Sequence, residues 1–144
     1  TDVETIITLS PADSMPNSLK SLDSTFLQCF SLKNVPHIPD SVSALTYTFG
    51  YCNQLVNAPV IPINVTDMTY TFSNCTNLSG DVYIKTNKVT SALNCFVNSS
   101  LNKDVYIPFK YDNGVQSATY NAFTSVGYST TARVNGALLY DYNT

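Results

Sequence analysis

The stretch LTYTFGYCNQLVNAPVIPINVTDMTYTFSNCTNLSGDVY, residues 45–83, repeats its own pattern after 23 positions. The tripeptide Tyr-Thr-Phe occurs at 47–49 and again at 70–72, and each time a cysteine follows the Phe by three residues. The same step of 23 relates residues on both sides of this stretch: Phe26, Phe49 and Phe72; Cys29, Cys52 and Cys75; Leu32, Leu55 and Leu78; Ile38, Ile61 and Ile84. A fixed period between 20 and 50 residues indicates a repeat architecture.

Each repeat has two halves of different character. The three clear repeats occupy about 15–38, 39–61 and 62–84. Apolar residues at spacings of three and four in the first half predict a helical or 3₁₀ turn. The second half is short and predicts a strand of about four residues; in the first two repeats it contains a proline, which favours an extended conformation. One repeat cannot bury its apolar stripe alone, so we expect neighbouring repeats to stack.

A fourth, degenerate repeat follows the three clear ones. Phe96 comes 24 residues after Phe72, which places one inserted residue before it. The sequence DVYI at 81–84 then reappears at 104–107, back in step at 23, so a compensating deletion is expected near 99–101.

The two ends are expected to cap the stack. Residues 1–14 predict a capping strand, because a solenoid end otherwise exposes apolar surface and unpaired strand edges. In 110–144 the sequence predicts a turn at 112–114, a short helix over 117–126 and one or two terminal strands. The predicted fold is therefore a leucine-rich-repeat-like solenoid over 15–109, with short parallel strands plus helical or 3₁₀ turns, closed by a small α+β cap.

The matched apolar positions predict a core made of vertical rows of equivalent side chains. These positions are Phe26, Cys29, Leu32, Ile38, Phe49, Cys52, Leu55, Ile61, Phe72, Cys75, Leu78, Ile84 and Phe96. We interpret the cysteines as small buried core residues, although stacked neighbours could also be oxidised. Zinc is not expected, because the chain has no C-x-x-C motif and a single histidine.

Composition restricts the classes of partner. The net charge is −3, only 12% of the residues are charged, and the basic residues form no cluster. Neither nucleic acid nor membrane insertion is therefore expected, since there is no basic patch and no run of 18 apolar residues. A neutral surface rich in Ser, Thr, Asn and Tyr is typical of secreted and virion proteins. Together with a chain that begins at Thr1 without a leader, it suggests an extracellular mature form or fragment.

The repeat pattern F-x-x-C-x-x-L-x(5)-I-P-x-x-V-x-x-L/M-x-x-x-F, carried from Phe26 to Phe49, resembles the BspA-like leucine-rich repeats of bacterial surface proteins. The resemblance covers about 15–109. The segment 105–140 more loosely resembles the close of such repeats in bacterial surface proteins and in tail or fibre-like proteins of gut bacteriophages. These resemblances imply attachment to host matrix proteins, to other bacteria or to a cell surface. They imply no catalytic residue and no cofactor.

Alternation along the predicted strands selects one outward-facing set as a candidate binding surface. That set is His37, Val60, Asp81, Tyr83, Asp104 and Tyr106. Tyrosines beside aspartates suit a carbohydrate or a polar protein patch, since rigid aromatic rings offer contact area at low entropic cost. The alternative is that these side chains only stabilise one another across neighbouring strands.

Catalysis is not expected. Asp81 and Asp104 occupy equivalent positions on adjacent repeats, where two carboxylates could act as a glycosidase pair, but duplication explains them more simply. His37 has no Ser or Cys nucleophile at a recognised spacing. Four N-x-S/T sequons are interpreted as turn formers rather than glycan acceptors: Asn64, Asn74, Asn77 and Asn98.

Two functions remain open from the sequence. The first is a non-enzymatic recognition module on a phage virion appendage or a bacterial surface protein, which binds a cell-surface glycan or protein. The second is a structural decoration or docking domain whose sheet face is covered by a neighbouring subunit of a larger assembly, with oligomerisation possible in either case. Neither function requires a metal or a cofactor.

Overall fold

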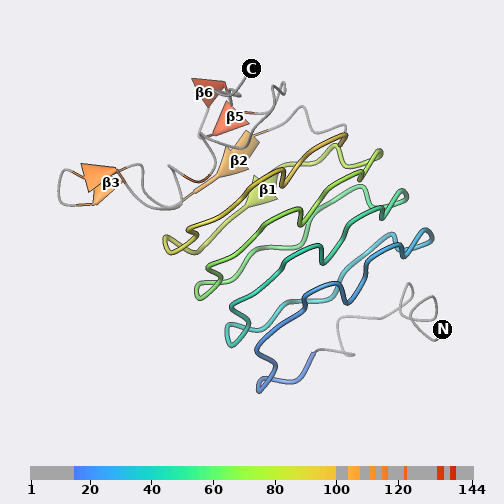
Figure 1. Cartoon of the computed structure of the whole chain (residues 1–144), viewed down its shortest axis with the longest axis horizontal. Coiled ribbons are helices and arrows are strands. Elements are labelled where there is room, and N and C mark those ends of the chain that lie inside the picture. Colours follow the sequence, from blue (N-terminus) through green and yellow to red (C-terminus); the bar gives the residue numbers. More distant parts are fainter. Residues whose placement is uncertain are drawn as a thin grey trace.

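The computed structural model of the chain describes residues 15–99, 104–107, 111–112, 115–116, 122, 133–134 and 137–138. Successive segments of the chain lie side by side, from the blue segment through green to yellow (Figure 1). We number them as repeat one (15–38), repeat two (39–61), repeat three (62–84) and repeat four (85–107). The capping strand expected in 1–14 and the deletion expected near 99–101 lie largely or wholly outside the described residues.

Backbone hydrogen bonds join each repeat to the next in a regular register. The donors in repeat one are the N–H groups of Leu22, Ser24, Phe26 and Gln28, and the acceptors in repeat two are the carbonyls of Ala44, Thr46, Thr48 and Gly50, at 2.8 to 3.0 Å. Equivalent alternate residues donate onward from repeats two and three: Leu45, Tyr47, Phe49 and Tyr51, then Met68, Tyr70, Phe72 and Asn74. Every second N–H group in these stretches therefore bonds to the following repeat.

This register explains why no helix forms in the first half of each repeat. The intervening N–H groups close tight turns within the repeat, for example from Thr25 to Leu22 and from Cys29 to Phe26, both at 3.0 Å. A continuous helix would need all of these N–H groups for bonds along its own axis. Residues 15–99 accordingly contain separate turns closed by i→i−3 hydrogen bonds, the bond type of a 3₁₀ turn, and no continuous helix.

Two positions in each repeat adopt a left-handed backbone conformation. They form two rows: Ser24, Tyr47, Tyr70 and Asn94 in the first, and Gln28, Tyr51, Asn74 and Asn98 in the second. Their φ angles lie between 50° and 61°. Asn tolerates this conformation better than most residues, whereas a bulky side chain there is uncommon. These residues turn the chain so that the row of Phe side chains between them points into the core.

The core is a file of phenylalanine rings. Phe26, Phe49, Phe72 and Phe96 stack with centroid separations of 5.6, 5.4 and 5.7 Å, and neighbouring rings are within 11° of parallel. All residues of the predicted core rows are at most 4% exposed. Close packing of this kind makes the stack sensitive to the loss of a single side chain.

Side-chain donors also connect the repeats inside the core. Each donates to a carbonyl 26 residues earlier: Thr48 to Leu22 at 2.9 Å, Thr71 to Leu45 at 2.8 Å, Cys52 to Phe26 at 3.1 Å and Cys75 to Phe49 at 3.0 Å. Each of these carbonyls also accepts a backbone N–H group within its own turn, and the additional bond gives the buried hydroxyl or thiol a partner. The cysteine row therefore supplies hydrogen bonds between repeats as well as small apolar volume.

Regular strands form only where the repeat lacks an internal proline. Strand β1 (Val82–Tyr83) pairs in parallel with β2 (Asp104–Tyr106), with Val82 opposite Val105 and Tyr83 opposite Tyr106. The strands expected over 35–38 and 58–61 are absent, apart from a single bridge between Ile61 and Ile84.

The reason lies in the residue that occupies the position of Val82 in each repeat. It is Pro36 in repeat one and Pro59 in repeat two. Proline has no N–H group to donate, so a strand ladder cannot extend through it.

Beyond the repeats, the sheet gains two further strands. Strand β2 pairs in parallel with β5 (Arg133–Val134), and β5 pairs with β6 (Ala137–Leu138) in antiparallel orientation, giving the order β1-β2-β5-β6. Strands β3 (Tyr111–Asp112) and β4 (Val115–Gln116) form an antiparallel pair on either side of the predicted turn. Of the helix expected over 117–126, only Ala122 is described, and it is helical.

We expect Phe49→Ala to lower the free energy of unfolding by about 3–5 kcal/mol, because it opens a cavity between two stacked rings. Phe30→Ala is the matched control, since Phe30 is 50% exposed, and it should cost less than about 1 kcal/mol. Urea unfolding followed by circular dichroism measures both values. Equal costs for the two variants would contradict the stacked core.

Candidate functional site

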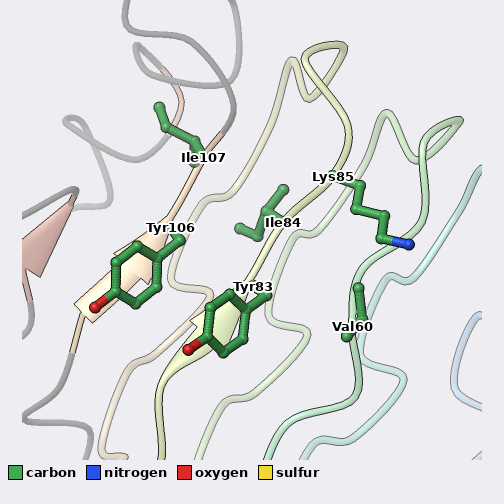
Figure 2. A pocket seen from close by; sticks show the side chains of 6 residues that line it. All are labelled: Val60, Tyr83, Ile84, Lys85, Tyr106 and Ile107. Carbon is green, nitrogen blue, oxygen red and sulfur yellow. The ribbon is translucent and has the colours of Figure 1, made fainter.

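A stacked pair of tyrosines stands on the face of the sheet that points away from the core. Tyr83 in β1 and Tyr106 in β2 are register partners, with ring centroids 4.9 Å apart and ring planes within 9° of parallel. Tyr83 is 50% exposed and Tyr106 is 37% exposed. Figure 2 shows the two rings side by side on adjacent segments of the chain. Parallel pairing of two short strands is thus enough to align two large aromatic side chains.

An open hollow of about 450 Å³ lies beside this pair. We call it the tyrosine hollow, and it is lined by Val60, Tyr83, Ile84, Lys85, Tyr106 and Ile107. Ile84 and Ile107 are nearly buried, whereas Val60 and the two tyrosines stand well above the surface. The result is a mostly apolar concavity with aromatic and aliphatic walls.

The hollow arises where a row of equivalent side chains changes size. The residue equivalent to Tyr83 in repeat two is Val60, so the ring face that Tyr83 turns away from Tyr106 meets a much smaller side chain (Figure 2). Backbone bonds from Ile61 to Tyr83 at 2.9 Å and from Lys85 to Ile61 at 2.8 Å hold these two repeats together. The space left by the missing ring is open to solvent.

Lys85 is the one charged residue among those that line the tyrosine hollow. Its ammonium group can donate hydrogen bonds to hydroxyl or carboxylate oxygens. The tyrosine rings offer flat apolar faces and phenolic hydroxyls. The arrangement can hold a ligand that combines an apolar face with oxygen acceptors.

Only part of the predicted site is assembled here. Val60, Tyr83 and Tyr106 are among the residues that line the tyrosine hollow. Asp81 is half-buried and lies just before β1. The backbone of Asp104 begins β2, opposite Arg133, but its side chain is outside the description.

His37 lies apart from the hollow. It is exposed, but among the described residues no backbone bridge connects its segment with 58–61. The prolines at 36 and 59 prevent the continuous sheet that would have carried the row from Tyr83 down to His37. His37 is therefore not among the residues that line the tyrosine hollow.

Sequence reasoning missed three residues of the hollow. Lys85 is the next outward position after Tyr83, and simple alternation beyond the expected strand would have found it. The sequence pattern assigns Ile84 to the core alone, and Ile107 is its equivalent in repeat four. They are nearly buried, at 3% and 6% exposure, but what remains exposed forms the floor of the hollow.

The described residues carry no cluster suited to metal binding and no helix able to cross a membrane. No three His, Cys, Asp or Glu side chains among them come together in a way that could hold a metal ion. Likewise, no described helix is both long enough and apolar enough to span a bilayer.

At two of the four sequons the asparagine side chain donates a hydrogen bond to a backbone carbonyl of the preceding repeat. Asn64 donates to Asp40 and Asn77 donates to Asn53, both at 2.7 Å.

All four cysteines are buried. Burial raises the pKa of Cys75 to about 12. It also raises the pKa of Cys52 and of Cys95 far above the ordinary range, and for Cys52 the neighbouring thiols Cys75 and Cys29 add to this effect. Nucleophilic or metal-binding chemistry requires the thiolate. These thiols therefore act as packing and hydrogen-bonding groups at neutral pH.

We compared the chain with family models, with curated proteins and with solved structures, and none of them matches it. What the tyrosine hollow binds must therefore be inferred from its own residues.

The raised thiol pKa predicts a loss of stability in alkali. A thiol that ionises near 9.0 when unfolded but near 12 when folded stabilises the fold fully below pH 9, and this contribution is lost as the pH rises towards 12. Between pH 9 and 11 the unfolding free energy of Cys75→Ala should therefore decrease less steeply with pH than that of the unmodified chain. The difference between the two slopes should be up to about 1.4 kcal/mol per pH unit. Urea unfolding at each pH measures the slopes.

Phe30→Ala serves as the control for this comparison, because Phe30 is exposed and does not titrate. Its slope should match that of the unmodified chain. If Cys75→Ala also gives an unchanged slope, Cys75 is not a buried, protonated thiol.

Proposed function

We propose that the chain is a leucine-rich-repeat-like solenoid that serves as a non-enzymatic recognition module, and that it binds a cell-surface glycan or protein through the tyrosine hollow. The observation that carries this proposal is the pair of exposed, parallel rings of Tyr83 and Tyr106 beside an open concavity. Large aromatic side chains are usually buried, and a pair held in the open is suited to contact with a partner.

The rings are already in place for binding. They are fixed by the pairing of Val82 with Val105 directly beneath them and by their contact with each other. Little side-chain entropy is then lost when a partner binds, which favours affinity. A sugar ring could lie with its C–H face on Tyr83, while Lys85 bonds to its oxygens.

The solenoid assignment is supported by the spacing of the hydrogen bonds between repeats. At least four backbone donors in each of repeats one to three bond to acceptors 22 or 23 residues ahead. Such nearest-neighbour contacts are the defining property of repeat proteins, whose extended surfaces typically bind partners.

We place this module on a phage virion appendage or a bacterial surface protein. The support is the resemblance of the repeat to BspA-like sequences and the low content of charged residues, 12%. Both fit an extracellular setting, in which partners are cell-surface polymers or proteins.

A structural docking domain is the second candidate. It is favoured by the apolar character of the tyrosine hollow, which would suit burial against a neighbouring subunit. Cross-linking of the intact assembly from Lys85, followed by mass spectrometry, would show whether another subunit covers the hollow. Coverage in the intact assembly would favour docking and exclude attachment through this face.

For the recognition function we expect Tyr83→Ala and Tyr106→Ala each to weaken binding at least about tenfold, since each removes a stacked ring. Binding to a glycan array and to whole bacterial cells provides the measurement. Val56→Ser is the matched control: Val56 is 45% exposed, lies outside the hollow, and has Ser79 as its equivalent in repeat three. Attachment that survives both tyrosine substitutions would show that the hollow is not the binding surface.

A further inference from the structure

A second stacked pair of tyrosines lies among the turns, away from the sheet. The rings of Tyr47 and Tyr70 have centroids 4.6 Å apart and planes within 4° of parallel. The side chain of Asn94 donates a hydrogen bond to the hydroxyl of Tyr70 at 2.7 Å. Tyr47 is 37% exposed, whereas Tyr70 is half-buried between its neighbours. Tyr70 thus stacks on one face of Tyr47, and its own hydroxyl is bonded to Asn94.

The free face of Tyr47 points along the row towards a small residue. The equivalent position in repeat one is Ser24, whose backbone N–H bonds to Thr46 at 2.9 Å. Ser24 is too small to cover a phenol ring. The tyrosine hollow has the same arrangement, because there the stacked pair of Tyr83 and Tyr106 is followed by the smaller Val60 in repeat two. The same rule of equivalent positions therefore leaves an exposed aromatic face in two separate places.

A second row of neutral side chains runs beside the first. It contains Gln28, Tyr51, Asn74 and Asn98, with Tyr51 44% exposed and Asn98 donating to Asn74 at 3.1 Å. None of the side chains in the two rows is charged at neutral pH. The two rows therefore present amides, hydroxyls and phenols, and beside them the carboxylate of Asp23 accepts a hydrogen bond from the N–H group of Thr46 at 2.8 Å.

Between the two rows lies a stretch of buried residues. Thr48, Phe49 and Gly50 are buried, and Tyr47 and Tyr51 are the exposed residues on either side of them in the chain. A Cβ atom on Gly50 would lie 2.8 Å from Cδ1 of Leu27 and 3.2 Å from Oγ of Ser73, so the glycine permits close packing in this buried stretch.

The tyrosines are not the residues that the backbone prefers here. Tyr47, Tyr51 and Tyr70 have φ angles of 54°, 60° and 54°. In this conformation Asn costs less than Tyr, and repeat four has Asn at both positions, Asn94 and Asn98. Strain that the fold does not require is found most often at functional sites.

We propose that Tyr47 and Tyr51 form a second binding surface, and that its ligand is a neutral polysaccharide. Aromatic faces bind the apolar C–H face of a sugar ring, while amide and hydroxyl groups bond to sugar hydroxyls. The two rows offer no cation for a phosphate or a carboxylate, which distinguishes this surface from the tyrosine hollow with its Lys85. The surface lies outside the tyrosine hollow and acts independently of it.

Affinity electrophoresis tests the proposal with named probes. Native gels would contain yeast mannan, dextran, xyloglucan or barley β-glucan as neutral polymers, and polygalacturonate as the anionic one. We expect at least one neutral polymer to retard the chain, and Tyr47→Asn and Tyr51→Asn each to raise the dissociation constant at least about fivefold, given the value of one aromatic contact. Both variants should fold, because repeat four carries Asn at the same positions.

Val56→Ser is the control, and the polymer should retard it as much as the unmodified chain. Tyr83→Ala shows whether any retardation is due to the tyrosine hollow or to the second surface. Retardation that falls with Tyr47→Asn but not with Tyr83→Ala supports the second surface, whatever the tyrosine hollow binds. Retardation that falls with Tyr83→Ala alone overturns the second surface and leaves the tyrosine hollow intact. The proposal is also wrong if no neutral polymer retards the chain, or if only polygalacturonate does, and a protein partner would then be the remaining class to test.

Discussion

The register between neighbouring repeats is the constraint on which the structure depends. Alternate N–H groups in each repeat must meet carbonyls in the next repeat, and the same register brings Phe49 over Phe26 and under Phe72. A slip of one residue would break both the backbone bonds and the file of rings. The inserted residue of repeat four is tolerated because it lies between Ile84 and Val89, in a turn where the hydroxyl of Thr86 bonds to Val65 at 2.8 Å. The extra length is absorbed there, and Phe96 still stacks on Phe72.

The same register explains the surface. Because equivalent positions lie in rows, a chemical feature that occurs in two neighbouring repeats becomes a pair, and a change in the next repeat ends it. Tyr83 and Tyr106 form such a pair that ends at Val60, and Tyr47 and Tyr70 form another that ends at Ser24. Pairs of this kind arise by duplication and divergence of one unit, so a recognition surface needs no new fold. Rigid backbone rows then hold the rings ready for a partner.

Much of the core could be predicted from the sequence, because a period of 23 and a pattern of apolar residues follow directly from the letters. The local backbone could not. Apolar spacings of three and four fit a helix and also fit successive tight turns, and only the competition for N–H groups between repeats decides the outcome.

The hydrogen bonds of the cysteine row could not be predicted either, since a buried thiol that donates to Phe26 or Phe49 looks the same in sequence as one that only fills space. The tyrosine hollow was found in part, through Val60, Tyr83 and Tyr106, whereas His37 is not among the residues that line it. The second tyrosine pair was missed because alternation along strands says nothing about side chains on turns.

The stacking of repeats is tested most directly by contacts between phenylalanine rings in solution. In a sample with isotopically labelled Phe, nuclear Overhauser effects should connect Phe26 with Phe49, Phe49 with Phe72, and Phe72 with Phe96 in one unbranched series. No effect should connect Phe26 with Phe72, since Phe49 lies between them. The absence of the sequential contacts, or a direct contact between Phe26 and Phe72, would contradict the stacked arrangement from which both tyrosine surfaces follow.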